Sequence, residues 1–218
     1  EDVPALLDRM IEISIGVAIG VGVNLIVVPP LRDRQATETV EALRKQVGEV
    51  LGQISEGFNN NWDEEQAREC SDAVRDIRQN LDQSWSEVRF ARNSRRRNPR
   101  LLFLGSSSEK YEQVLSSLDE AVAHLRHLTR TLEDAATSQT HWDNNFHTRW
   151  SAVLETVATR ISNPEEDVEP AIDQLDRLAR EMLNHDQLGE ENWPLYGALI
   201  SSTRNISELI DQVSTATK

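Results

Sequence analysis

The sequence predicts an all-α protein, in which one transmembrane helix precedes a cytosolic antiparallel bundle of about six helices. Three observations lead to this fold class. One long apolar run extends from Ile11 to Val28, and beyond it apolar residues recur at alternating spacings of three and four, which is the period of one helix face. Glycine and proline are sparse, at 9 and 7 of 218 residues. No stretch alternates polar and apolar residues as a half-buried strand does.

The apolar run is eighteen residues long and is interrupted only by Glu12, Ser14 and Asn24. At about 1.5 Å per helical residue it reaches roughly 27 Å, close to the thickness of a bilayer core. It also carries three glycines that can share a face, namely Gly16, Gly20 and Gly22. Such a face weakens a helix in water but lets membrane helices approach closely. A buried core helix of a water-soluble protein is the alternative interpretation.

Pro29 and Pro30 are predicted to stop this helix, because proline lacks an amide donor. The predicted domains are therefore residues 1–30, the transmembrane helix with its lead-in, and residues 31–218, the helical domain. Four basic residues follow the run closely, whereas only Arg9 precedes it; they are Arg32, Arg34, Arg44 and Lys45. Because basic residues stay on the cytoplasmic side, we expect the C-terminal domain to be cytosolic.

The soluble part should begin with a long helical hairpin over residues 32–97. Its first helix has an apolar stripe of Val40, Leu43, Val47, Val50 and Ile54. Three asparagines, 59–61, end that helix, and Asn61 or Asp63 can cap the next. The second stripe comprises Ala67, Cys70, Val74, Ile77, Leu81, Trp85 and Val88. Matching stripes joined by a short polar loop favour antiparallel packing.

Four further helices are predicted at 108–136, 141–161, 170–185 and 194–216. Each contains apolar residues at helical spacing. Local signals mark their ends: the Asn163–Pro164 step breaks the second of them, and Pro170 suits the first turn of the third.

Six arginines gather at the end of the hairpin, in an otherwise acidic chain: Arg89, Arg92, Arg95, Arg96, Arg97 and Arg100. The return helix should bring them back to the bilayer surface, where a basic cluster attracts anionic headgroups by about 1 kcal/mol per residue. The alternative is that they pair with acidic side chains of the bundle or complement a helix C-terminus.

The formal net charge of −14 argues against nucleic acid as a partner. The single cysteine, Cys70, excludes an intrachain disulfide and fits a reducing compartment. Its place in an apolar stripe suggests a buried hydrophobe. The chain begins with Glu1 in the lead-in to an apolar helix, so we expect it to be a piece of a longer protein.

Within the run, Glu12 and Asn24 are the candidate intramembrane polar residues. Glu12 can reach interfacial water, and Asn24 can bond a neighbouring helix or line a path. His124 and His127 lie three residues apart without an evident third ligand, so no metal site is predicted. The sequence contains no nucleophile elbow, phosphate-binding loop or dinucleotide fingerprint. We therefore predict no catalytic residues, no cofactor and no enzyme.

The run and its continuation resemble one known family. The block from Arg9 to Pro30 contains Ile15, Gly16, Gly20, Val23 and Asn24 before the proline pair, and it is followed by Leu31 to Arg34, Trp85 and Ala91 to Arg100. This pattern resembles the last membrane helix, and the start of the cytosolic domain, of the aromatic acid exporter and fusaric acid resistance-like bacterial proteins. The resemblance covers roughly residues 9–100.

The resemblance implies the C-terminal part of a bacterial inner-membrane exporter of aromatic or other organic acids. Its implied partners are the lipid bilayer, the N-terminal membrane helices of the same protein, and further copies in a homo-oligomer. The cytosolic bundle would serve gating, assembly or support. The alternative function is a membrane-anchored helical scaffold or oligomerisation module without transport activity.

Overall fold

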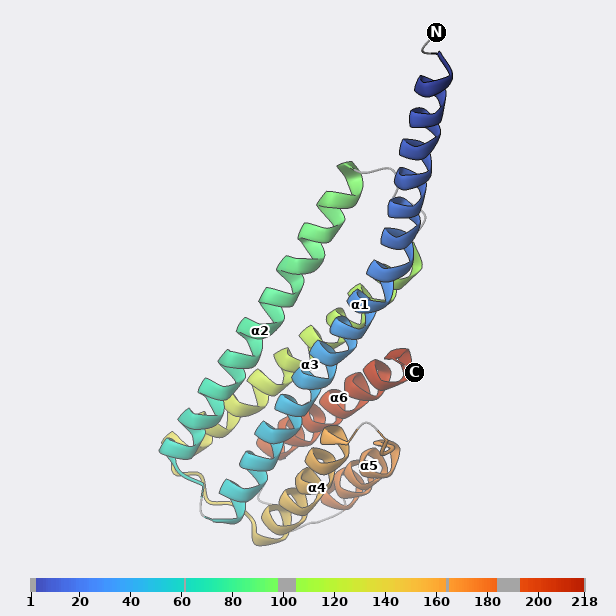
Figure 1. Cartoon of the computed structure of the whole chain (residues 1–218). Helices are drawn as coiled ribbons and strands as arrows, with labels where there is room; N and C mark the ends of the chain where they lie inside the picture. The colour runs from blue at the N-terminus through green and yellow to red at the C-terminus, as the bar shows by residue number, and fades with distance from the viewer. Residues whose placement is uncertain (1–2, 61, 98–104, 164, 184–192, 218) are drawn as a thin grey trace. The chain divides into compact units, whose positions relative to one another are not determined.

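The computed structural model describes the backbone of residues 3–60, 62–97, 105–163, 165–183 and 193–217 (Figure 1). Side chains are described for the same residues except 3–8, 21–35, 91–97, 105–108, 183 and 217. Over these ranges the regular structure consists of six α-helices and no strand, which confirms the all-α class.

The helices follow one another with short connections. Their bounds are α1 Val3–Asn59, α2 Glu64–Arg97, α3 Gly105–Thr137, α4 Asn144–Ser162, α5 Glu169–Leu183 and α6 Trp193–Thr217. They form two compact units, Glu1–Glu38 and Thr39–Lys218. The division falls inside α1, further along the chain than the predicted boundary after residue 30.

One prediction about α1 is wrong, because the helix does not stop at Pro29 and Pro30. Proline costs an interior helical position about 3 kcal/mol, since it removes one hydrogen bond and crowds a carbonyl. Its fixed φ is nevertheless helical, and elongating a helix is easier than nucleating a new one. With helical sequence on both sides, the backbone remains helical through the pair.

In the C-terminal unit, α3 packs against both α2 and α6, and α5 packs against α4 and α6. The side chains facing inward are those of the predicted stripes. Val47, Leu81 and Leu125, for example, are fully or almost fully buried. A single cluster of buried apolar residues joins all six helices, with α1 contributing from Val40 onward. Helical periodicity therefore identified the core correctly, although Trp85 is only partly buried.

The crossing of α1 with α4 is closer than the apolar stripes indicate. A Cβ built on Gly48 would lie 3.0 Å from the carbonyl oxygen of Ala158, and one built on Gly52 would lie 3.9 Å from the Ala158 Cβ. Ser55 donates a hydrogen bond from its hydroxyl to the Ser151 carbonyl at 2.9 Å. Small residues therefore line this crossing, and the backbones can approach.

Aromatic rings close one end of the unit around Phe58, which is fully buried. The Phe58 ring lies 4.7 Å from Trp142, 5.0 Å from Trp150 and 4.7 Å from His147, measured between ring centroids. Trp62, in the loop before α2, connects that loop to α3, because its indole N–H donates to the Leu132 carbonyl at 3.1 Å.

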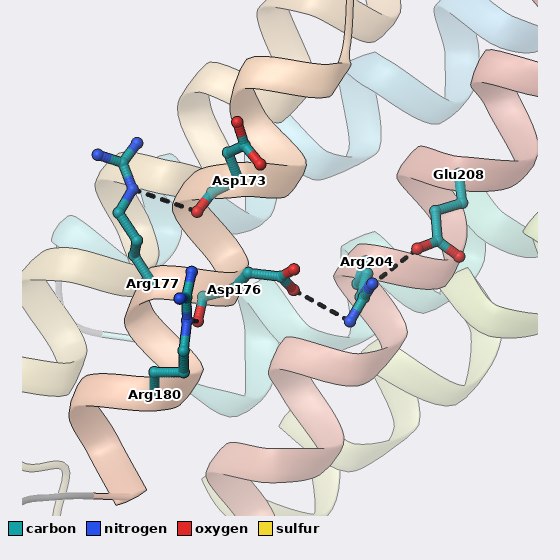
Figure 2. Close-up of polar contacts among 6 residues, drawn as sticks. All are labelled: Asp173, Asp176, Arg177, Arg180, Arg204 and Glu208. Atoms are coloured by element: carbon teal, nitrogen blue, oxygen red, sulfur yellow. Dashed lines mark hydrogen bonds and ion pairs between the residues drawn. The ribbon is translucent and has the colours of Figure 1, made fainter.

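On the surface of the C-terminal unit, one arginine links α5 with α6 (Figure 2). Arg204 on α6 lies 3.0 Å from the Asp176 carboxylate on α5 and donates to Glu208 at 2.8 Å. The hydrogen bond to Glu208, followed by the charge of Asp176, raises the pKa of Arg204. Arg204 remains about half exposed, so this link is a surface contact.

Candidate functional site

The most unusual surface of the protein is the N-terminal part of α1, where apolar side chains project away from the helix without cover. All residues from Arg9 to Gly20 are exposed. Six large apolar side chains in this stretch are between 55% and 65% exposed: Met10, Ile11, Ile13, Ile15, Val17 and Ile19. We call residues 9–20 the apolar segment. Among the described residues of the C-terminal unit, the one comparably exposed large apolar side chain is Phe90, at 76%.

The apolar segment has an open glycine face and few polar groups. A Cβ built on Gly16 or Gly20 would meet nothing within 4 Å, so another helix or a lipid chain can approach the backbone there. The Ser14 hydroxyl donates to the Met10 carbonyl at 2.7 Å, which satisfies its donor within the helix. Glu12 is exposed. The segment therefore offers a surface suited to apolar surroundings.

Among the described residues, none of the helices is both long enough and apolar enough to span a bilayer. The backbone of Gly22, Asn24, Pro29 and Pro30 belongs to α1, but the surroundings of Gly22 and the side chains of the other three are not described.

The arginine cluster is described only at its beginning. Arg89 is exposed on α2, next to Phe90. The side chains of Arg92, Arg95, Arg96 and Arg97, and the whole of Arg100, lie outside the described residues. The predicted lipid contact of this cluster stays a prediction.

Two side chains singled out in the sequence, the Cys70 thiol and the Arg44 guanidinium group, are buried. Cys70 is 3% exposed, and burial, together with the nearby charge of Glu69, raises the pKa of its thiol to about 11. Arg44, counted above among the residues that orient the chain, lies inside the bundle at 5% exposure and donates to the Ser214 hydroxyl at 3.1 Å. Burial lowers its pKa. Arg44 is thus packed inside the C-terminal unit.

The two histidines on α3 do not assemble a metal site. His127 is exposed and His124 is partly exposed. In the part of the chain that the structure describes, no group of three or more histidine, cysteine, aspartate or glutamate side chains is arranged to hold a metal ion.

Sequence reasoning missed two hollows in the C-terminal unit. One, of about 710 Å³, lies at the aromatic end between the start of α2 and the α3–α4 connection, and Trp62, Glu65 and Trp142 are among its lining residues. The other, of about 770 Å³, runs between α2 and α3 and is lined by several arginines. No local sequence motif predicts either hollow, because each is lined by residues from separate helices or loops.

Comparison with known proteins leaves the chain without a match: no family model, no curated protein and no solved structure is significantly similar to it.

Proposed function

We propose that this chain is a membrane-anchored helical module, in which the N-terminal part of α1 enters the bilayer and the unit Thr39–Lys218 lies in the cytosol. The observation that carries the proposal is the exposure of six large apolar side chains in the apolar segment. Removing such side chains from water is favourable by about 1.5–3 kcal/mol each, so leaving all six in water is costly by roughly 10 kcal/mol. The apolar sequence continues to Val28, which gives the length that a span requires.

We further propose that the module is the C-terminal part of a bacterial inner-membrane exporter of aromatic or other organic acids. The support is the family resemblance of residues 9–100, above all the glycine pattern followed by Asn24 and the proline pair. In this role the helix packs against other membrane helices of the same protein through Gly16 and Gly20, and a homo-oligomer is the expected assembly. The bundle then gates, assembles or supports the transport pathway.

The second candidate is an anchored scaffold or oligomerisation module without transport activity. The open Gly16 and Gly20 face favours it as well, because small residues support helix association whatever the assembly does. Transport measurements on the complete protein in proteoliposomes separate the two. Movement of organic acids supports the exporter, and an assembled protein that moves none under any gradient supports the scaffold.

The arginine cluster is proposed to contact anionic lipid beside the anchor. Arg89 and Phe90 are both exposed, and a cation next to an aromatic ring is typical of interfacial segments. We expect replacement of Arg89 and Arg92 by Gln to weaken association with anionic vesicles. High salt should weaken the association of the native chain in the same way.

The anchor is tested by membrane fractionation of the 1–218 chain, with a high-salt wash followed by detergent. We expect the native chain to require detergent. The double variant Ile15→Asp, Ile19→Asp should lose this requirement, since each acidic residue in the bilayer core is costly by about 2.5–3.5 kcal/mol. The matched control is Gln53→Asp, Ala152→Asp, which adds the same charge at exposed positions of the C-terminal unit. Release of the native chain by salt alone would contradict the anchor.

A further inference from the structure

A basic groove runs along the contact between α2 and α3 in the C-terminal unit, with a volume of about 770 Å³. We call it the α2–α3 groove. Its lining includes the apolar Val74 and Val122 and four arginines, Arg75, Arg78, Arg126 and Arg130. A volume of this size is typical of sites for small molecules. A local concentration of arginine is unexpected in a chain with 37 acidic and 23 basic residues.

Two of the four arginines belong to ion pairs. Arg75 pairs with Asp72 on its own helix. Arg78 pairs with Asp82 at 3.4 Å and with Asp119 across the groove on α3. The Asp72 contact fixes Arg75 on α2, and the Asp119 contact fixes the Arg78 guanidinium between α2 and α3. Both groups are therefore already positioned at the groove before a ligand binds.

The other two arginines, Arg126 and Arg130, differ from the first pair. Within the described residues, neither Arg126 nor Arg130 makes an ion pair or a side-chain hydrogen bond from its guanidinium group. They are four residues apart on α3, where like charges oppose each other by a few tenths of a kcal/mol. Asp134 follows Arg130 by four residues, but a cation that precedes an anion is the less favourable order along a helix. Two arginines without an ion pair among the described residues therefore line the groove.

The two acidic residues that line the groove, Glu133 and Asp134, are neighbours near the end of α3. Glu133 accepts a hydrogen bond from the Ser71 hydroxyl at 3.4 Å, and Asp134 is its neighbour. The Arg78 pair with Asp119 lies toward the other end of α3. Arg126 and Arg130 lie between these positions in the chain, so a bound anion is expected at these two arginines.

We propose that the α2–α3 groove binds a small multivalent oxyanion, a molecule with two or more carboxylate or phosphate groups. The guanidinium group presents parallel N–H donors that match both oxyanions in bidentate fashion. One oxyanion group bridges Arg126 and Arg130 and relieves their repulsion, and a second reaches Arg75 or Arg78. The inference does not depend on the proposed transport function, since it concerns the C-terminal unit alone.

The proposal is tested by isothermal titration of the 1–218 chain in nonionic detergent at low ionic strength. The probes are citrate for carboxylates, pyrophosphate for phosphates and acetate as a monovalent control. We expect saturable binding of citrate, pyrophosphate or both, at least about tenfold tighter than that of acetate, with affinity falling as salt is added.

Two double variants locate the site. Arg126→Gln, Arg130→Gln should weaken binding by about tenfold or more, because it removes the two unpaired cations. Arg177→Gln, Arg180→Gln removes the same charge from α5, far from the groove in sequence and on another helix (Figure 2), and should leave binding unchanged.

Each outcome bears on the proposal. Binding of one probe class identifies the oxyanion, and binding of both assigns the shared chemistry. The proposal is overturned by absence of saturable binding to either multivalent probe, or by equal weakening in both double variants, which would indicate a general effect of net charge. Circular dichroism of each variant shows whether the helical fold is retained, and a further variant, Arg126→Lys, should bind with intermediate affinity because it keeps the charge but loses the bidentate fork.

Discussion

Gly48 of α1 and Ala158 of α4 lie so close together that a Cβ on Gly48 would stand 3.0 Å from the Ala158 carbonyl oxygen. The same Cβ would collide with the Ser162 hydroxyl, which donates to the Ala158 carbonyl at 2.8 Å. Gly52, one turn later, has room, since its nearest neighbour would be the Ala158 Cβ at 3.9 Å. Two glycines of one helix face therefore differ in what an added methyl group would meet.

Gly48→Ala should lower the free energy of unfolding by about 1–3 kcal/mol, because overpacking at a backbone contact outweighs the gain in helix propensity. Gly52→Ala is the matched variant and should leave stability unchanged or raise it by up to about 1 kcal/mol. Urea unfolding followed by tryptophan fluorescence measures both. A Gly48→Ala protein as stable as the native chain would show that the two helices are further apart than described.

Phe58→Ala should be among the most destabilising single substitutions in the C-terminal unit, at about 3–5 kcal/mol. Phe58 is fully buried and contacts the rings of Trp142, His147 and Trp150, so truncation leaves a cavity among large rigid neighbours. Phe90→Ala is the control, since that ring is 76% exposed and its removal should change stability by less than about 0.5 kcal/mol. The comparison uses the same unfolding assay, and equal effects would contradict the described core.

Cys70 should resist thiol reagents in the folded protein at pH 8 and react quickly once urea unfolds the chain. Burial limits access and raises the thiol pKa from 9.0 to about 11, so little thiolate exists at pH 8. The measurement is the rate of labelling by a chromogenic disulfide with and without denaturant. Rapid labelling under native conditions would place Cys70 at the surface.

The same pKa shift predicts how stability depends on pH. The Cys70 thiol holds its proton more tightly in the folded chain than in the unfolded one. Its contribution to the free energy of unfolding is therefore complete below pH 9 and is lost as the pH rises toward 11. The loss is roughly 2 kcal/mol. Cys70→Ala lacks this titration. Between pH 8 and 11 the native chain should therefore lose more stability than the variant does. A constant difference would contradict the shift.

Arg204→Gln should cost less than about 1 kcal/mol, although Arg204 contacts two carboxylates. Its side chain is 45% exposed, so solvent and salt screen the pairs. The difference in stability from the native chain should shrink further in 1 M salt, where the Debye screening length is about 3 Å. Urea unfolding at low and high salt checks this, and a large salt-independent loss would mean that the α5–α6 contact depends on this arginine.

The helical class, the approximate bounds of α2 to α6 and the residues that face the core were predictable from the sequence. These follow from local information, because the spacing of Val40, Leu43 and Val47, or of Leu125, Leu128 and Leu132, fixes one face of a helix whatever packs against it. The apolar run was likewise evident from residue type alone, and the fractionation experiment tests the membrane role proposed for it.

The way in which those faces meet depends on contacts between distant parts of the chain. The close approach of Gly48 to Ala158 joins residues more than a hundred positions apart, and the ring cluster at Phe58 joins the end of α1 with the start of α4. The α2–α3 groove likewise joins arginines from two helices. The continuation of α1 through Pro29 and Pro30 depended on the helical segments on either side, which outweigh the local preference of the two prolines. Local spacing records which side of a helix is buried, whereas contact distances and unpaired charges arise only when separate helices pack together.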